Sequence, residues 1–447
     1  IQQKLNLNNE AKLNYNYLIK VENNLKAMIN LYNIYLFEEK YYEALSIIDN
    51  ILKIQKIENV HKDKAFASLK LNNVKASKEI CEYYLFRNNK DLVALNILGQ
   101  CFFTEGNHNK AIETFNNILA IDPNNLSAIN SLGRIYHEGL DSEKAEKFFL
   151  DALKIDDSSY QVINNIAGFY REEGKSNKAV EFYKKAIALN PNNPYIYNNL
   201  SKTYFDLNKY EEAKKNSFKA LELKPDDGEV QKTLSYIFFK DHDFENGWNY
   251  FDGRLSLNDF IKKNENIERL NKKLFRKKTL KNSKSKFLIV REQGVGDEIL
   301  YGSMYSDLLK NMENITIECD ARLLSLFKRS LPEYRKSFVE LGSISNDHHK
   351  LEEIDYVLYA GSLGKYYRNN ITNFTNKPFL KVDEKRYLEI KNILSEYKNK
   401  YNIGISWKSF NNRYSSDKSL DLDDFKHVFK LPNCNIFNLQ YGDVVDE

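Results

Sequence analysis

A period of 34 residues runs through the first half of the chain and restricts what it can fold into. Between residues 91 and 260, a small residue recurs at this spacing, an aromatic residue follows three positions later, and a second small residue follows twelve positions after the first. The three sets are Gly99, Gly133, Ala167, Ser201 and Ser235; Phe102, Tyr136, Tyr170, Tyr204 and Phe238; and Ala111, Ala145, Ala179, Ala213 and Gly247. Amphipathic helices pack closely where small residues meet, and each helix pair leaves an apolar face that the next pair covers. The period therefore predicts a stack of helix pairs.

The spacing also identifies a type of repeat. Pro123, Pro191 and Pro225 close three of the units. Together with the small and aromatic positions, these prolines resemble the tetratricopeptide repeat. We therefore predict an α-solenoid of about seven units forming a right-handed superhelix, with degenerate units over 1–90 and regular units over 91–255. The last unit, "DFENGWNYFDGRL", is bulkier than the others, and we expect the next domain to cover its open face.

A column of asparagines follows the same period on the first helix of each unit, off the apolar stripe. Its members are Asn96, Asn130, Asn164 and Asn198, and Asn165 and Asn199 stand beside two of them. This helix face should line the inner surface of the superhelix. Because amides both donate and accept hydrogen bonds, the column predicts a ladder that binds the backbone of an extended acceptor polypeptide. Asn is abundant throughout the chain, so a purely compositional origin is the alternative.

Composition excludes several classes of protein. The net charge of +4 is small, and charges of both signs are interleaved, which argues against nucleic acid as a partner. The four cysteines form no CxxC pair, so we expect no metal site, no disulfide framework and a cytoplasmic location. No segment reads as a membrane span or a signal peptide. The chain begins with Ile rather than Met, which suggests a missing N-terminus.

The second half changes class. Residues 256–284 are rich in Lys and Asn and read as a solvated basic connector. Short apolar strands then alternate with helical segments. We predict strands at 286–290, 315–319, 356–361, 401–407 and 435–443, and helices at 296–311, 321–331 and 384–398. This alternation predicts an α/β sheet whose ligands gather at the carboxyl ends of the strands.

Five motifs in this half occur in a specific order: "VREQGVGDEI", "CDARLLSLFKRSLP", "GSLGKYYR", "IGISWKS" and "NLQYGD". Together they resemble the catalytic region of bacterial tetratricopeptide-repeat glycosyltransferases, which is related to heptosyltransferases and more distantly to the O-linked N-acetylglucosamine transferase. The resemblance implies a GT-B fold of two Rossmann-like halves, the acceptor side at 285–400 and the donor side from 401. It also implies a nucleotide-sugar donor as substrate, with no metal and no further cofactor.

The resemblance assigns roles to individual residues. A Gly-Asp turn after the first strand supplies the general base in heptosyltransferase-like proteins, and that residue is Asp297 here; helix capping is its alternative role. Glu292 is the second candidate base, while Glu298 and Arg368 are interpreted as surface charges. The donor diphosphate is expected to contact Lys418, Ser406, Lys408, Arg413, Gly294 and Gly296, with Lys418 as the first choice.

The chain departs from this family at its end. The stretch after residue 402 is too short to hold a nucleotide base and ribose, so the second half is incomplete, and we expect this chain alone to be inactive. Two hypotheses follow. The chain is part of a protein glycosyltransferase whose repeats bind the acceptor polypeptide, or it is a non-catalytic peptide-binding scaffold with a vestigial α/β domain.

Overall fold

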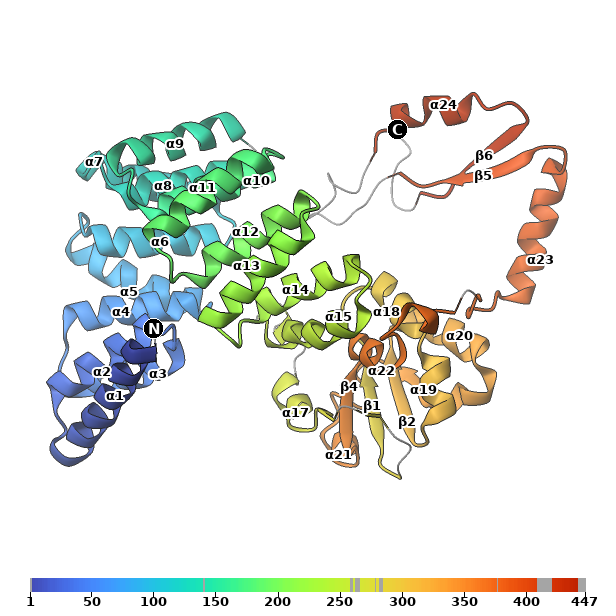
Figure 1. The fold of residues 1–447 in the computed structure, drawn as a ribbon, viewed down its shortest axis with the longest axis horizontal. Coiled ribbons are helices and arrows are strands. Elements are labelled where there is room, and N and C mark those ends of the chain that lie inside the picture. Colours follow the sequence, from blue (N-terminus) through green and yellow to red (C-terminus); the bar gives the residue numbers. More distant parts are fainter. Residues whose placement is uncertain are drawn as a thin grey trace. The chain divides into compact units, whose positions relative to one another are not determined.

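The computed structural model describes residues 2–139, 141–257, 260–261, 266–277, 279–280, 284–375, 377–407 and 420–440, without the side chains of residues 2–7. The chain divides into two compact units, Ile1–Phe260 and Ile261–Glu447. The first unit is built of helices, and the second combines helices with two parallel sheets (Figure 1). In the described residues, no helix is both long and apolar enough to cross a membrane.

The first unit is a helical solenoid (Figure 1). Its helices are α1 (Gln2–Glu22), α2 (Leu25–Phe37), α3 (Tyr41–Ile54), α4 (Glu58–Lys70), α5 (Val74–Arg87), α6 (Leu92–Thr104), α7 (His108–Ile121), α8 (Leu126–Glu138), α9 (Ser142–Ile155), α10 (Tyr160–Glu172), α11 (Ser176–Leu189), α12 (Pro194–Asp206), α13 (Tyr210–Leu223), α14 (Gly228–Lys240) and α15 (Phe244–Phe251). From α2 onward they form helix–turn–helix pairs, each packed against the next, and α14 with α15 is the seventh pair. The predicted solenoid is therefore present.

The repeated small residues lie where the two helices of a pair touch. A Cβ atom added to Gly133 would come within 2.8 Å of the Phe149 ring, and one added to Gly99 within 2.7 Å of the Phe115 ring. Both rings are 1% exposed. The missing side chain thus makes room for the aromatic ring of the partner helix, which explains why small and large residues alternate at this period.

Asn and Asp side chains start many of these helices. Nine of them lie at N-cap positions and accept a hydrogen bond from a backbone N–H of the first turn: Asn24, Asn73, Asp91, Asn107, Asn125, Asp141, Asn193, Asp227 and Asp243. Such caps satisfy amide donors that have no partner within the helix. Capping therefore accounts for five asparagines of the solenoid, which differ in this role from the asparagines in the helix interiors.

The C-terminal end of the solenoid is covered by its own chain. After α15, the short 3-10 helix η1 (Asp252–Ser256) packs on α14, so that a Cβ atom on Gly228 would meet Gly253 O at 2.5 Å. Arg254 is buried, donates to Phe251 O at 2.9 Å and lies over the Phe251 ring. Bulky residues of the last repeat thus pack within the unit, and the expected cover by the next domain stays a prediction.

The second unit contains a four-stranded parallel sheet of order β3-β2-β1-β4. Its strands are β1 (Phe287–Val290), β2 (Ile315–Cys319), β3 (Phe338–Glu340) and β4 (Tyr356–Tyr359). The helices of the unit are α17 (Ile267–Lys272), α18 (Val295–Gly302), α19 (Tyr305–Asn311), α20 (Ala321–Ser330), α21 (His348–Glu352), α22 (Gly364–Tyr367), α23 (Glu384–Ile393) and α24 (Lys426–Phe429). The strand order reverses at β1, so the turn after β1 lies at a topological switch point, where open α/β sheets bind ligands.

Three local features differ from the sequence prediction. The basic stretch 256–284 is partly folded, since α17 carries buried Ile267 and Leu270, and Phe275 joins the core of the sheet. The predicted helix 296–311 is two helices, α18 and α19. The strand β3 was not expected; its Phe338 is buried in the core of this unit.

A second parallel sheet consists of β5 (Tyr401–Ile405) and β6 (Cys434–Asn438), paired from Tyr401–Cys434 to Ile405–Asn438. Helix α23, which precedes it, has no buried residue. The described residues therefore hold two small parallel sheets, and a GT-B arrangement of two Rossmann-like halves stays a proposal.

Candidate functional site

Two regions contain the predicted site residues: a row of amides on the solenoid and the turn that follows β1. The amides project from the first helices of successive pairs, namely α6, α8, α10 and α12. Asn96, Asn130, Asn164, Asn165 and Asn199 are half-buried, whereas Asn198 is only 5% exposed. The 34-residue period places each amide beside its counterpart in the next pair, so neighbouring amides can bond.

Two such bonds form a ladder. Asn165 Nδ2 donates to Asn130 Oδ1 at 3.0 Å, and Asn199 Nδ2 donates to Asn164 Oδ1 at 3.2 Å. Each rung of the ladder is one such hydrogen bond, and it occupies the Nδ2 group of one asparagine and the Oδ1 atom of the other. Among the described residues, no contact engages Nδ2 of Asn130 or Asn164, or Oδ1 of Asn165 or Asn199. The ladder therefore presents free donors in one column and free acceptors in the next.

The two ends of the column differ from its middle. Asn96 is satisfied locally, because its Nδ2 donates to Ser127 Oγ at 2.7 Å and its Oδ1 accepts from Gln100 Nε2 at 2.7 Å. Asn198 Oδ1 is buried without a hydrogen-bond partner among the residues that the structure describes. The residue that would donate to it in the next pair is Thr233, whose hydroxyl donates to Glu229 O at 2.9 Å instead. The ladder thus ends at Asn198 with an unpaired acceptor.

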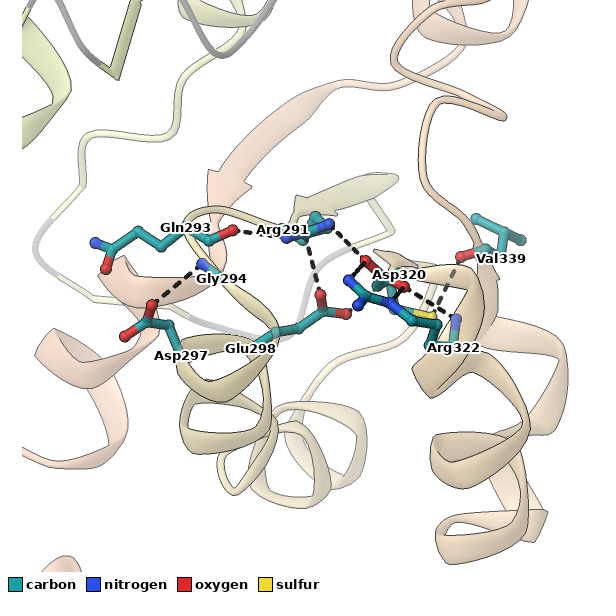
Figure 2. Close-up of polar contacts among 9 residues, drawn as sticks. Arg291, Gln293, Gly294, Asp297, Glu298, Asp320, Arg322 and Val339 are labelled. Atoms are coloured by element: carbon teal, nitrogen blue, oxygen red, sulfur yellow. Dashed lines mark hydrogen bonds and ion pairs between the residues drawn. The ribbon is translucent and has the colours of Figure 1, made fainter. Parts of the chain in front are cut away.

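In the turn after β1, Asp297 caps its own helix (Figure 2). It is the third residue of α18, and its Oδ2 accepts a hydrogen bond from the backbone N–H of Gly294 at 3.1 Å. Gln293 just before this turn has a φ of 63°, a left-handed conformation that is uncommon for residues other than glycine. Asp297 is half-buried, and its Oδ1 makes no hydrogen bond or ion pair with the described residues. One carboxylate oxygen therefore caps while the other remains accessible.

The neighbouring residue Glu298 points away from Asp297 into a network of charges (Figure 2). It is fully buried; its Oε1 accepts from the Asp320 backbone N–H at 2.9 Å, and its Oε2 lies 3.0 Å from Arg291 Nε. Arg291 also contacts Asp320, which accepts two side-chain bonds from Arg322. Burial raises the pKa of Glu298, whereas the bond from Arg322 lowers the pKa of Asp320. The network joins the ends of β1 and β2.

Three charged residues of the second unit are buried, two of which the sequence analysis placed at the surface. Glu292 is 4% exposed and accepts a hydrogen bond from the Gly361 backbone N–H, which ties the loop after β1 to the loop after β4. Arg368 is 5% exposed and contacts Asp307 at 2.8 Å and Ser303 O at 2.9 Å. Together with Glu298, these residues hold loops in place. The surface interpretation was therefore wrong for Glu298 and Arg368, and Glu292 has little access to a substrate.

Three of the six predicted donor-binding residues lie outside the described part of the chain. Lys408, Arg413 and Lys418 belong to the segment 408–419, which the structure does not describe. Ser406 follows β5 and donates to Gln440 Oε1 at 3.1 Å, and the backbone N–H of Trp407 bonds the same oxygen at 2.9 Å. Of the two glycines, Gly294 already donates its N–H to Asp297. The role of all six residues in phosphate binding stays a prediction.

The fold of the first unit defines a helical-repeat protein, and comparison with known families gives the type of repeat. The tetratricopeptide repeat matches residues 92–125, 126–159 and 194–227, and a further TPR repeat model matches residues 169–206. The chain thus carries tetratricopeptide repeats in its first half, between residues 92 and 227. Repeats of this kind generally bind proteins or peptides, so this half is a protein-interaction scaffold.

Similar proteins resemble limited parts of the chain. Protein FlbA of Caulobacter vibrioides is 24% identical over 176 residues, which cover 36% of this chain and 29% of that protein. A thermophilic TPR protein of Thermus thermophilus covers 41% of this chain and all of its own length, at 22% identity and a TM-score of 0.39. A tetratricopeptide repeat protein of Parabacteroides merdae covers 54% of this chain and 96% of its own length, at 14% identity and a TM-score of 0.41.

Proposed function

We propose that this chain is the acceptor-binding part of a protein glycosyltransferase. The solenoid would bind an extended segment of an acceptor protein, and the α/β unit would contribute the general base for transfer of a sugar from a nucleotide-sugar donor. In that reaction, the carboxylate takes the proton of the acceptor hydroxyl, the oxygen attacks the anomeric carbon, and the nucleoside diphosphate leaves. Preorganised donors would stabilise the charge that develops on the leaving diphosphate.

The amide ladder supports the acceptor half of the proposal most directly. An extended backbone offers N–H and C=O groups along its length, whatever its side chains are. The free Nδ2 donors of Asn130 and Asn164 match carbonyl groups, and the free Oδ1 acceptors of Asn165 and Asn199 match N–H groups. These four amides cap no helix, so helix capping does not account for their recurrence.

Accessibility supports Asp297 as the base. Three acidic residues follow β1, and two of them, Glu292 and Glu298, are almost or fully buried and bonded to backbone N–H groups. Asp297 alone of the three is half-exposed. It also lies at the switch point of the sheet, where a ligand is expected. Capping and catalysis do not compete here, since Oδ2 caps the helix and Oδ1 is available for a proton.

The acceptor half can be tested with peptides. A random library of 12-residue peptides is selected on the full chain, and affinities of the enriched peptides are measured by fluorescence anisotropy. We expect the pair Asn164→Ala/Asn199→Ala to weaken binding by about tenfold, because the two hydrogen bonds that this rung offers to the peptide backbone are lost. The control is Asn117→Ala, an exposed asparagine on α7 outside the column. Equal losses for both variants would refute the ladder.

The transferase half needs a separate measurement. Because this chain alone is expected to be inactive, the assay uses the longer protein of which it is proposed to be a part. UDP-, GDP- and ADP-linked sugars are supplied with an enriched peptide, and intact-mass spectrometry detects transfer. Asp297→Asn keeps an oxygen that can accept the Gly294 N–H, so it should leave the thermal unfolding temperature unchanged. It should nevertheless lower turnover by about 10²–10⁴-fold, the usual effect of losing a general base. Unchanged turnover in a folded variant would leave Asp297 with capping only.

A binding scaffold without catalysis is the second candidate, and one observation favours it. The carboxylate of Asp297 already has a structural role as a cap, so its position does not require catalysis. This candidate predicts that peptides bind through the ladder while no nucleotide-sugar is consumed. The two assays above therefore separate the candidates.

A further inference from the structure

A hydrogen-bonded contact joins the first helix pair of the solenoid to the sixth. Tyr195, at the start of α12, donates its hydroxyl to Oε2 of Glu39, which lies in the turn between α2 and α3. Lys224 Nζ, just after α13, donates to the Tyr195 hydroxyl at 2.7 Å and lies 3.4 Å from Glu39 Oε2. Four helix pairs separate the two sides along the chain. The solenoid therefore touches itself at this point.

The hydroxyl of Tyr195 is the centre of this contact. It accepts from the ammonium group of Lys224 and donates to the carboxylate of Glu39, so both charged groups act through it. Burial and the bond to Glu39 raise the pKa of Tyr195 to about 12, so the hydroxyl keeps the proton that it donates. Lys224 also lies 4.8 Å from the centre of the Tyr195 ring and 3.4 Å from Asp227. The three side chains thus form one connected group with the two ends of opposite charge.

Glu39 is unusual for its place in the repeat. Its φ is 58°, a left-handed conformation that is uncommon for residues other than glycine and asparagine. Five other turns within helix pairs have a positive φ at the corresponding position, which holds Asn72, Gly106, Gly174, Asn208 and His242. A backbone in a sparsely populated conformation points to a function of its side chain. The bond to Tyr195 supplies such a function for Glu39.

Lys224 and Tyr195 depart from the repeat in the same way. Lys224 is the residue that follows the second helix of its pair, a position held in other pairs by Gln55, Asn88, Asp122, Asp156 and Asn190. Tyr195 is the second residue of its helix, where α6, α8, α10 and α14 have Val93, Ser127, Gln161 and Glu229. Three departures from the repeat pattern therefore meet in one contact, which indicates that the contact is a specific feature of this chain.

The contact links opposite edges of the solenoid. The two helices of a pair are connected by turns on one edge, where Glu39 lies, and successive pairs are connected by turns on the other edge, where Lys224 and Tyr195 lie. A superhelix whose opposite edges meet closes on itself. The amide ladder lies next to this closure, because Asn199 is one turn after Tyr195 on the same face of α12.

We propose that Glu39, Tyr195 and Lys224 form a clasp that closes the superhelix beside the amide ladder and controls the entry of a polypeptide. This inference rests on the proposed binding of a peptide by the ladder. With the clasp closed, a free chain end can enter along the inner surface, whereas the middle of a long chain enters only after the clasp opens. Glu39 and Lys224 are nearly half exposed, and exposed ion pairs are weak, so the clasp can open at ordinary temperature.

Spin-label distances test whether the clasp exists in solution. Nitroxides are attached at Ser46→Cys on α3 and Lys215→Cys on α13, two exposed positions outside the clasp. The background is Cys434→Ser, because the other three cysteines are buried. Double electron–electron resonance should give one narrow distance distribution for the unmodified clasp.

Charge reversal supplies the matched variants. Glu39→Lys and Lys224→Glu each bring like charges together, so each should broaden the label distances and shift them upward. The double variant Glu39→Lys/Lys224→Glu restores opposite charges and should largely restore the narrow distribution. Lys90→Glu reverses an exposed lysine in an earlier turn between helix pairs and should change nothing.

Association rates test the control of entry. An enriched peptide is prepared free and as the middle of a flexible linker between two small folded domains, which block both of its ends. Stopped-flow fluorescence anisotropy measures the association of each form with the full chain. Glu39→Lys should raise the association rate of the blocked form by about three- to tenfold and that of the free form less, because a larger fraction of the chain is open. The double variant should return the rate toward that of the unmodified chain.

The outcomes separate the clasp from the function on which it rests. Unchanged label distances in both single reversals refute the clasp. Longer distances with an unchanged association rate of the blocked form show a contact that does not control entry, and this also refutes the proposal. If Asn164→Ala/Asn199→Ala leaves the affinity of both peptide forms unchanged, the proposed binding by the ladder fails and the control of entry to it fails with it, while the label distances still decide whether the contact forms.

Discussion

Replacing Arg291 by Gln should destabilise the α/β unit in a pH-dependent way. Arg291 lies 3.0 Å from Glu298 Oε2 and also donates to Gln293 O at 2.6 Å. Glu298 has no exposed surface. Removing the guanidinium leaves a buried carboxylate that keeps only its bond from the Asp320 N–H. Breaking one side of a buried ion pair typically costs about 3–5 kcal/mol.

Protonation of Glu298 sets an upper limit on this cost. An ordinary carboxyl group has a pKa near 4.5, and each pH unit above it adds about 1.4 kcal/mol to the cost of keeping the group protonated. At pH 7 the penalty is therefore limited to about 3.4 kcal/mol, and at pH 5 to about 0.7 kcal/mol. Burial raises the folded pKa of Glu298, so the folded state binds the extra proton and its stability falls as pH rises above about 4.5. The stability of the Arg291→Gln variant should therefore fall more steeply with rising pH than the stability of the unmodified chain.

Hydrogen exchange measures the effect locally. Peptides from α18 and β2, analysed by mass spectrometry and corrected for intrinsic exchange rates, give the opening free energy at pH 5 and pH 7. The double variant Arg291→Gln/Glu298→Gln contains no buried charge at this pair and should regain most of the loss. Arg335→Gln, which changes an exposed arginine of the same unit, is the control. A loss below about 1 kcal/mol at pH 7, or no recovery in the double variant, would refute the reasoning.

Two further predictions concern single side chains. Phe149→Ala should lower the unfolding free energy of the solenoid by about 3–5 kcal/mol, because the buried Phe149 ring fills the space over Gly133. Hydrogen exchange in α8 and α9 measures this loss, and a value under about 1 kcal/mol would contradict the packing. Asp320→Asn should make the unfolding free energy of the α/β unit depend less on pH in acid. The bond from Arg322 lowers the pKa of Asp320, so the ionised carboxylate stabilises the fold at neutral pH, and this stabilisation is lost as pH falls below about 4. Circular dichroism during acid titration checks it, and equal acid sensitivity would count against the ion pair.

The solenoid could be predicted from the sequence because the repeats show which positions recur together. One small residue in one helix says little about its neighbours. The spacing from Gly99 to Phe115 is the same as that from Gly133 to Phe149, which indicates that these positions face each other. In the structure, each glycine packs against the corresponding ring. The strands of the second unit were also recognisable from their continuous apolar runs. The strand β3 was missed because only three residues pair, and of these only Phe338 is fully buried.

The buried acids could not be predicted from one sequence. Glu292 is bonded to Gly361, and Glu318 accepts from the N–H groups of Ile344 and Ser345, all far away in the chain. A Glu in a polar stretch therefore reads as a surface charge until the fold supplies its partner.

The amide ladder also predicts the length of the bound segment. Its rungs lie on α8, α10 and α12, the first helices of three successive pairs. Packed helices are about 8–10 Å apart, which gives roughly 16–20 Å over two intervals. An extended chain advances about 3.3 Å per residue, so about six residues span the row. Peptides shortened below about six residues should lose affinity gradually, because ladder contacts disappear one at a time. Affinity that is independent of length down to about three residues would mean that the amides contribute nothing to binding.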